Sequence, residues 1–406
     1  MTVSITEALD IIYKNIQPLS TEILPIEMVL GRICAEDVTA VLDMPRFDNS
    51  AMDGYAVKCA DAGKTVRCTE VIFAGDSPQT PLKQGEAIKI MTGAPLPEGC
   101  EAIVPVEQAE AKGDDVMLPP EILPGSFHRE AGSDMGSGAV YLSLGEEINA
   151  YRIALLASQG VTHLQVFRKI KVVVFGTGDE LRPHYEKIEA HQLYNSNTPM
   201  FLERAKELGC EVRYVPRSID TIASLEEAIR SSIDADIIIT SGGVSMGDKD
   251  FTKEAFRNLG MELFFDKVQI KPGKPTAFGK IGDTAIINLP GNPLASMVNF
   301  EVFIRAVIYR MSGAKAYRQN TIETTLREDF RIKAGNYTVK LGSFDGKTFM
   351  PFKQQLPGML SPMQHADGYI ITPPDVTFLA KGTKVRMIPI HWDCRSEKEE
   401  VFFTGG

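Results

Sequence analysis

The sequence predicts a multi-domain protein of the α/β plus β class, with a central doubly wound α/β domain, an N-terminal helical segment and two β-rich domains. Its 406 residues exceed one ordinary hydrophobic core, because a domain usually takes about 100 to 200 residues. Between residues 171 and 314, short apolar runs alternate with helical segments, which is typical of parallel strands covered on both faces. The neighbouring regions contain short β-rich runs separated by glycine and proline, which favours small β domains.

The order of these patterns along the chain predicts four domains. An amphipathic helix is expected from about Ile5 to Ile16, where Pro18 ends it, and a second helical run begins near Asn149. The expected domains are an N-terminal helical and linker domain (1–43 and 145–170), an inserted β-rich domain (44–144), the α/β domain (171–314) and a C-terminal β-barrel-like domain (315–406).

The α/β domain is predicted from strand-like and helix-like segments in alternation. The strand-like segments are short and rich in β-branched residues, as strands buried on both faces are, and the segments between them have the helical period. In chain order the segments are "KVVVF", "NTPMFLERAKELG", "CEVRYVP", "TIASLEEAIRSSI", "DIIIT", "TAIINLPGNP" and "LASMVNFEVFIRAVIYRMSG".

Composition excludes several classes of protein. A net charge of -10 and a pI near 5.3 argue against a nucleic-acid or membrane-surface partner, because phosphate backbones and anionic lipids require basic surfaces. The six cysteines form no C-x-x-C pair and the six histidines no H-x-x-x-H, so a zinc site or a disulfide framework is not expected. The N-terminus has no basic start followed by a long apolar run, so we expect a cytoplasmic protein.

The loops that follow the predicted strands share one chemistry. They contain glycines that let backbone N–H groups approach a ligand, together with small hydroxyls and carboxylates, and such loops form phosphate sites at helix N-termini. Carboxylates beside phosphates predict a hard cation such as Mg²⁺. The loops are "GTGDE" (176–180), "RSID" (217–220), "TSGGVSMGDKD" (240–250) and "LPGNP" (289–293).

A basic turn complements these loops. In "IKPGKP" (270–275), two prolines and a glycine stiffen a turn that presents Lys271 and Lys274, which suits the binding of an anion. The residues therefore predict a Mg²⁺-assisted site for a phosphorylated ligand. Purely structural interpretations stay open, since "GTGDE" is also a common strand-to-helix turn and Asn292 of "LPGNP" also suits a helix cap. Neither a P-loop nor a G-x-G-x-x-G motif is present.

The stretch "PRFDNSAMDGYAV" (45–57) places two carboxylates, an amide and a hydroxyl between apolar residues without any periodicity. Asn, Ser and Asp-Gly are turn formers, so composition alone favours a solvated turn.

Six motifs taken together resemble the molybdopterin molybdenumtransferase family, which includes bacterial MoeA and the E domain of gephyrin. They are "FDNSAMDGYAV", "IMTGAPLPEG", "GTGDEL", "TSGGVSMGDKDFTKEAF", "IKPGKPTAFGK" and "LPGNP". The resemblance implies a molybdopterin-binding-like α/β domain and an enzyme that inserts molybdate into adenylylated molybdopterin with release of AMP, assisted by Mg²⁺. It also implies an elongated homodimer with an active site shared between subunits, and other enzymes of molybdenum cofactor biosynthesis as possible partners.

The motif matches identify the residues of this chain that correspond to the family's site residues. The resemblance also implies that the stretch 45–57 is a loop whose Asp53 reaches the active site of the partner subunit. The residues implied as catalytic are Asp53, Asp134, Glu180, Asp220 and Asp250, of which Glu180 and Asp250 are the implied metal ligands. Those implied in substrate binding are Thr92, Arg129, Gly176, Thr177, Gly178, Ser241, Gly242, Gly243, Ser245, Lys271, Lys274, Pro290, Pro293 and Ser361, with Asp179 and Asp248 as weaker candidates. Asp220 also suits a helix N-terminus, and Asp134 also suits a turn.

The C-terminal region departs from the family pattern. Leu356-Pro357 stands where relatives have Gly-Ser, and Lys340 replaces an arginine whose bidentate grip a lysine lacks, although Ser361 is retained. Alternatives therefore stay open: a catalytically weak paralogue that acts as a molybdopterin- or protein-binding scaffold, a tungsten-selective insertase, or an adenylyltransferase for molybdopterin.

Overall fold

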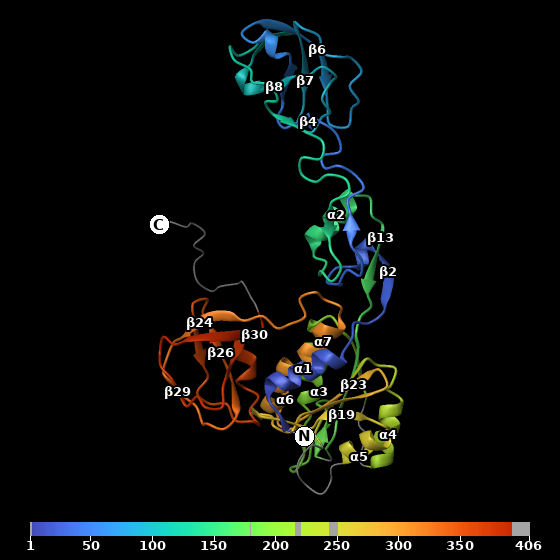
Figure 1. Ribbon diagram of the computed structural model, residues 1–406, viewed down its shortest axis with the longest axis vertical. Helices are drawn as coiled ribbons and strands as arrows, with labels where there is room; N and C mark the ends of the chain where they lie inside the picture. Colours follow the sequence, from blue (N-terminus) through green and yellow to red (C-terminus); the bar gives the residue numbers. More distant parts are fainter. Residues whose placement is uncertain (1, 179, 216–220, 243–250, 392–406) are drawn as a thin grey trace. The chain divides into compact units, whose positions relative to one another are not determined.

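The computed structural model describes residues 2–178, 180–215, 221–242 and 251–391. The chain divides into two compact units (Figure 1). The first comprises Met1–Ala35, Gly145–Asn149 and His163–Gly406, and the second comprises Glu36–Leu144 and Ala150–Thr162. The finer division into four domains stays a prediction.

The first unit contains a six-stranded sheet in the order β17-β14-β18-β23-β22-β19. The first four of these strands are parallel, as predicted. β22 pairs antiparallel with both β23 and β19. Only Gly282 and Asp283 connect β22 to β23, and so short a link makes a hairpin, which sets the direction of β22. The bounds are β14 (Lys171–Gly176), β17 (Glu211–Tyr214), β18 (Ile237–Ser241), β19 (Glu262–Phe265), β22 (Ala277–Ile281) and β23 (Thr284–Leu289).

Helices cover both faces of this sheet, which confirms the doubly wound fold class. Successive side chains of a strand point to opposite faces. Accordingly Val172 and Val174 pack with α1, α3 and α6, whereas Val173 and Phe175 pack with α4 and α5. Figure 1 shows α4 and α5 together, apart from α1, α6 and α7. The bounds are α1 (Ile5–Asn15), α3 (Asn197–Glu207), α4 (Ile222–Arg230), α5 (Phe251–Asn258), α6 (Pro293–Asn299) and α7 (Arg305–Met311).

Two helical segments have distinctive local features, namely the start of α1 and the turn between α6 and α7. Helix α1 begins with a capping box, in which Ser4 Oγ accepts from Glu7 N and Glu7 Oε2 accepts from Ser4 N. The segment predicted as one long apolar helix is continuous, but Phe300–Ile304 between α6 and α7 is a π-helix, η4. π-Helical turns are rare and often occur at functional positions.

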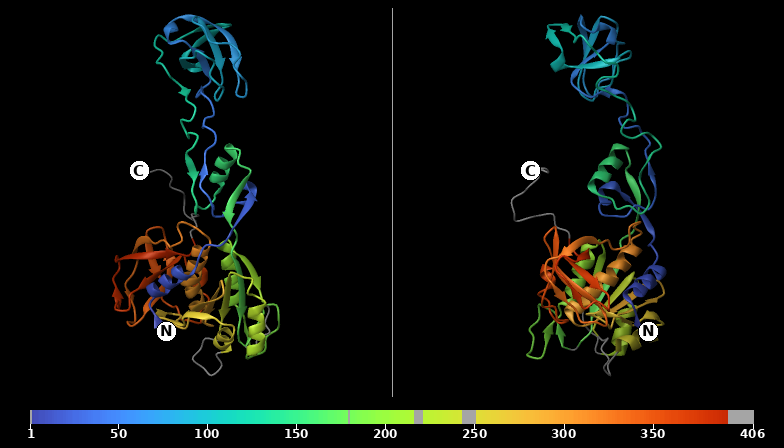
Figure 2. Two further views of the ribbon diagram at one scale, coloured as in Figure 1. Left: turned by 45° about the vertical axis from the view of Figure 1, so that its right-hand side comes forward. Right: turned by 60° about the vertical axis from the view of Figure 1, so that its left-hand side comes forward.

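Five strands at the C-terminal end close into a barrel, which confirms the predicted β-barrel-like domain. The order β26-β27-β24-β30-β28 returns to β26 through a β26–β28 pairing, and β21 adds to β26 (Figure 2). The bounds are β21 (Ile270–Lys271), β24 (Ile322–Leu326), β26 (Tyr337–Phe344), β27 (Thr348–Pro351), β28 (Gly368–Thr372) and β30 (Lys384–Pro389).

A buried cluster of charged side chains joins the barrel to the helices. The Glu301 carboxylate accepts from Arg204 Nε at 2.7 Å and from Arg305 Nη1 at 2.8 Å. The guanidiniums also donate to backbone carbonyls at the end of β30, from Arg204 to Ile390 at 2.9 Å and from Arg305 to Pro389 at 2.9 Å. The cluster therefore connects α3, η4 and α7 to the end of the barrel.

The second unit is built on the sheet β8-β5-β7-β6-β10-β9, which is buried on both faces. Tyr55 and Val57 of β5 pack in one apolar cluster, and Ala56 between them packs in another. The bounds are β5 (Gly54–Val57), β6 (Thr65–Ile72), β7 (Glu86–Ile90), β8 (Ala102–Pro105), β9 (Glu110–Lys112) and β10 (Asp115–Met117), with helix α2 (Ala150–Ser158) in the same unit.

The remaining strands form two-stranded ladders, and short 3₁₀ turns lie between them. The ladders are β1 (Thr2–Val3) with β20 (Lys267–Val268), β2 (Thr21–Pro25) with β13 (His163–Phe167), β3 (Val38–Thr39) with β12 (Val140–Leu142), β4 (Asn49–Ser50) with β11 (His128–Arg129), β15 (Leu181–Arg182) with β16 (Leu193–Tyr194), and β25 (Phe330–Arg331) with β29 (Phe378–Leu379). The 3₁₀ turns are η1 (Ile26–Met28), η2 (Cys59–Asp61), η3 (Val106–Gln108) and η5 (Met363–His365).

Two further findings concern the described part of the chain. None of its helices is long and apolar enough to cross a membrane. Five cysteines in it form no disulfide with one another, namely Cys34, Cys59, Cys68, Cys100 and Cys210.

Candidate functional site

The strand order reverses between β14 and β18, and glycine-rich loops leave the sheet at that point. From β14 the chain goes to β17 on one side, whereas β18 is followed in the sheet by β23 on the other. Open α/β sheets bind ligands in the crevice at such a switch point. Thr177 N donates to Ser241 O at 2.9 Å, and Thr177 Oγ1 donates to the same oxygen at 3.2 Å. The structure thus brings together the predicted residues Gly176, Thr177, Gly178, Ser241 and Gly242.

Gly242 makes this close approach possible. It has a φ of 96°, and a Cβ at this position would lie 2.4 Å from Thr177 O. Its N–H donates to Leu289 O at 3.1 Å, and its Cα lies 3.7 Å from the position a Cβ would take on Gly291. The "LPGNP" turn, with the predicted Pro290 and Pro293, therefore adjoins the other two loops.

Asn197 joins these loops, although the sequence did not indicate it. This buried residue is the first of α3, and its Nδ2 lies 2.8 Å from Ser241 Oγ and 2.8 Å from Gly291 O. Nearby Asn195 Nδ2 donates to Thr198 Oγ1 at 2.9 Å, and both groups crowd the position of a Cβ on Gly176. The signal available in the sequence was the polar run "NSNT" directly before Pro199.

Glu180 supplies the carboxylate of the first loop. Its side chain is exposed and lies over Gly178, where a Cβ would be 2.8 Å from Glu180 Oε2. Among the described residues, no group of three His, Cys, Asp or Glu side chains could hold a metal ion. A single carboxylate still fits Mg²⁺, which proteins often bind through one or two carboxylates plus ligand phosphates and water. The predicted Asp220, Asp250, Gly243 and Ser245, with Asp179 and Asp248, lie outside the described residues.

The basic turn packs on helix α6. Gly273 has a φ of 104°, and a Cβ there would lie 1.7 Å from Asn299 Nδ2, so only glycine fits. The turn exposes Lys271 and Lys274, as predicted. Lys340 lies near this turn, because Lys271 pairs with Thr338, two residues before Lys340 in β26. Burial lowers the pKa of the Lys340 ammonium group, and the charge of Lys271 lowers that pKa further. The position that departs from the family's arginine therefore adds a partly buried cation to the same group.

The barrel contributes one loop to the same region. Leu294 N, in the first turn of α6, donates to Pro357 O at 3.0 Å. The divergent pair Leu356-Pro357 is thus docked on the "LPGNP" turn, with Leu356 exposed. Ser361 lies on the same loop with an exposed side chain.

In the second unit, Asp53 and Thr92 form a compact pair. Asp53 Oδ1 accepts from Thr92 N at 2.7 Å and from Thr92 Oγ1 at 2.7 Å. These two hydrogen bonds lower the pKa of the Asp53 carboxyl below its usual value, so it is ionised at neutral pH.

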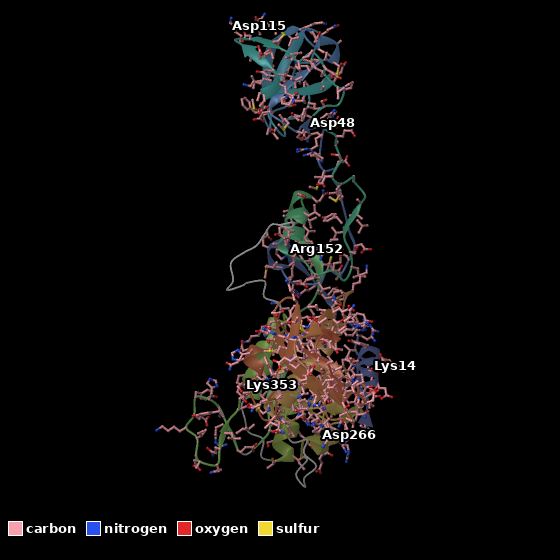
Figure 3. All side chains as sticks on the ribbon, turned by 90° about the vertical axis from the view of Figure 1, so that its left-hand side faces the viewer. Lys14, Asp48, Asp115, Arg152, Asp266 and Lys353 are labelled. Carbon is pink, nitrogen blue, oxygen red and sulfur yellow. The ribbon has the colours of Figure 1, made fainter. Side chains whose placement is uncertain are left out.

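Asp48 of the same motif has a structural part. Figure 3 labels Asp48. Its Oδ1 accepts from Ala131 N at 2.8 Å, and its Oδ2 lies 3.3 Å from His128 Nε2. The motif therefore combines a turn held by Asp48 with an exposed, ionised Asp53.

Arg129 and Asp134 line one pocket in the second unit. Its volume is about 770 Å³. The lining residues include Arg46, which the sequence did not indicate, and Ser133 and Ser158. Two guanidiniums beside hydroxyls suit an anionic group, and the Asp134 carboxylate limits where that charge can lie.

Comparisons with known proteins agree with this arrangement. Three family models match in order: the MoeA N-terminal region (domain I and II) over residues 3–160, a "probable molybdopterin binding domain" over 173–310, and the MoeA C-terminal region (domain IV) over 326–390. The molybdopterin molybdenumtransferase of Haemophilus influenzae is 37% identical over 74% of this chain and 76% of its own. Molybdopterin molybdenumtransferase 2 of Mycobacterium tuberculosis is 33% identical over 91% of this chain and 94% of its own. The crystal structure of a molybdopterin biosynthesis moeA protein from Pyrococcus horikoshii has a TM-score of 0.84 at 28% identity, and the match covers 97% of this chain and 100% of that chain.

Proposed function

Because the chain belongs to the MoeA family and acts in molybdenum cofactor biosynthesis, we propose that it is a molybdopterin molybdenumtransferase. Its substrates are adenylylated molybdopterin and molybdate, and its products are the molybdenum cofactor and AMP. The observation that carries this proposal is the convergence of the Thr177, Ser241 and "LPGNP" loops at the switch point of the sheet. Glycine-rich loops at such a position commonly bind phosphates through backbone N–H groups. In this chain the N–H groups of Thr177 and Gly242 hold the loops together.

Different residues of this chain would bind the phosphates, the oxyanion and the metal ion. The glycine loops bind the phosphates of the adenylylated substrate, and the Lys271–Lys274 turn holds the oxyanion beside them. Neither lysine has an ion-pair partner among the described residues, so both are available for an anion. Mg²⁺, bound by Glu180 together with Asp250, would offset the negative charge of the phosphates when the bond to AMP breaks.

The exposed groups of the second unit would complete the site of a partner subunit. Asp53 is exposed and ionised, and Arg129 and Asp134 line a pocket. These three side chains can therefore face a ligand that is bound by another copy of the chain. We therefore propose a homodimer with shared active sites, located in the cytoplasm. Sedimentation of the native chain tests the dimer.

AMP release from adenylylated molybdopterin tests the activity. The native chain is incubated with Mg²⁺ while molybdate or tungstate is titrated, beside Glu180→Gln and the control Glu323→Gln. Glu323 is an exposed carboxylate of the barrel that pairs with Lys384 at 3.0 Å. We expect oxyanion-dependent release that Glu180→Gln reduces at least 100-fold and the control leaves unchanged. Retained ligand binding without release by the native chain would instead indicate a binding paralogue, and the ratio of the two oxyanion affinities identifies the preferred metal.

A further inference from the structure

We propose that Asn197 is a positioning residue that orients the "LPGNP" turn against the end of β18 in the ligand site. The inference rests on the proposed function, because it assumes that the glycine-rich loops of this site bind the phosphates of the substrate. Asn197 belongs to neither segment and lies in α3, yet its amide contacts both.

The contacts determine how the amide is oriented. Gly291 O can only accept a hydrogen bond, so the group 2.8 Å from it must be the NH₂ of Asn197. The second N–H of that group is directed to Ser241 Oγ, also at 2.8 Å, and the Ser241 hydroxyl donates onward to Pro290 O at 3.2 Å. One amide thus links the end of β18 to the turn after β23.

This role differs from that of a helix cap. Asn197 is the first residue of its helix, and the preceding Ser196 occupies the cap position. A capping side chain accepts from N–H groups of its own helix, whereas Asn197 Nδ2 donates to Ser241 and Gly291 and also lies 3.4 Å from Ser296 Oγ in α6. Asn197 Oδ1 is buried without a partner among the described residues. An unpaired buried acceptor is unfavourable, so the amide orientation is set by its donor contacts.

The consequence for the ligand follows from the tight spacing at this point. Gly242 already lies against Thr177, so the first two loops have no room to approach further. The Gly242 N–H also holds Leu289, so the remaining freedom is the orientation of the turn that follows Leu289, where Gly291 O accepts from the Asn197 amide. A misplacement of about 1 Å in a binding constellation can cost about 100-fold. Loss of the amide donor should therefore weaken ligand binding more than it weakens the fold.

The experiment measures AMP affinity by calorimetry for the native chain, Asn197→Ala and Asn197→Asp, together with melting temperatures. Asn197→Asp keeps the size of the side chain but places an oxygen against the Gly291 carbonyl. The matched control is Thr284→Val, because Thr284 is buried and its Oγ1 also reaches two carbonyls, Ile233 O at 3.1 Å and Ala235 O at 2.9 Å. Thr284 is the first residue of β23, and the "LPGNP" turn of the ligand site follows the other end of this strand.

We expect both Asn197 variants to raise the Kd of AMP at least tenfold at a temperature where they remain folded. The control is expected to lower the melting temperature by a similar amount and to change the Kd less than twofold. An unchanged Kd in the Asn197 variants, or an equal loss of affinity in the control, would overturn the inference. Failure of the native chain to bind AMP would instead contradict the proposed function on which it rests.

A double-mutant cycle keeps the test decisive if Asn197→Asp does not fold. Asn197→Ala and Ser241→Ala each remove one side of the same bridge. If Asn197 acts through Ser241, the second substitution adds less than half of its separate effect on the Kd of AMP. Fully additive effects would contradict a positioning role through Ser241.

Discussion

Replacing Glu301 with glutamine is expected to destabilise the first unit strongly, because it leaves two guanidiniums without their shared anion. The Glu301 side chain is 2% exposed, and those of Arg305 and Arg204 are 5% and 14% exposed. Removing one partner of a buried ion pair costs about 3–5 kcal/mol.

The contacts that remain place this variant at the lower end of that range. Arg305 keeps Pro389 O and Gln319 Oε1, at 2.9 and 3.1 Å, and Arg204 keeps Ile390 O at 2.9 Å. Glutamine can still accept one of the lost hydrogen bonds. We therefore expect a loss of about 3 kcal/mol, which lowers the melting temperature by roughly 6–12 °C.

Thermal unfolding followed by circular dichroism measures this effect, with Glu323→Gln as the control. Both substitutions neutralise a carboxylate that pairs with a cation, but Glu323 and Lys384 are exposed, so the control should melt like the native chain. A Glu301→Gln variant that melts within 2 °C of the native chain would refute the reasoning that this cluster connects the barrel to the helices.

Three further predictions concern the site. Gly242→Ala should cost about 1–3 kcal/mol, because its φ of 96° strains any side chain and the new methyl would lie 2.4 Å from a neighbouring carbonyl oxygen; an unchanged denaturation midpoint would contradict this. Thr92→Val removes one of two hydrogen bonds to Asp53, so an NMR titration should show the carboxyl pKa rising part of the way to its usual value, and no rise would be contrary to the structure. Burial and Lys271 lower the pKa of Lys340, so bound molybdate should raise it again and take up protons, increasingly as pH rises toward that lowered pKa. Calorimetry of molybdate binding in two buffers of different ionisation enthalpy measures this proton uptake. Loss of the proton uptake in Lys340→Met would show that Lys340 is the group that takes up the proton.

Local features of the sequence predicted much of the α/β domain. Buried strands such as "KVVVF" and "DIIIT" and the amphipathic helices between them are visible as periodicity, and the loops after them have recognisable ligand-binding chemistry. The antiparallel end of the sheet was not predicted, because strand direction depends on the two-residue connection at Gly282 and Asp283 rather than on strand composition.

Only part of the candidate site could be predicted. Asp53 and Thr92 are far apart in the sequence, and their resemblance-based assignment did not indicate that they bond to one another. Arg46 and Asn197 were not indicated by any motif, although the structure places each of them beside residues that were. Contacts of this kind combine segments that the chain brings together only after folding.

The sequence by itself determined the order of strands and helices in the α/β domain, the glycine-rich loops and the family, because each of these depends on patterns among residues that are close together in the chain. The tertiary structure alone decided which distant polar groups meet: the Asn197 amide with Ser241 and Gly291, the Lys271–Lys274 turn with Asn299, and Glu301 with two arginines. The physical reason is that a buried polar side chain must find a partner of matching geometry. Many side chains of the chain could satisfy that requirement, and only the packing of the sheet, the helices and the barrel selects among them.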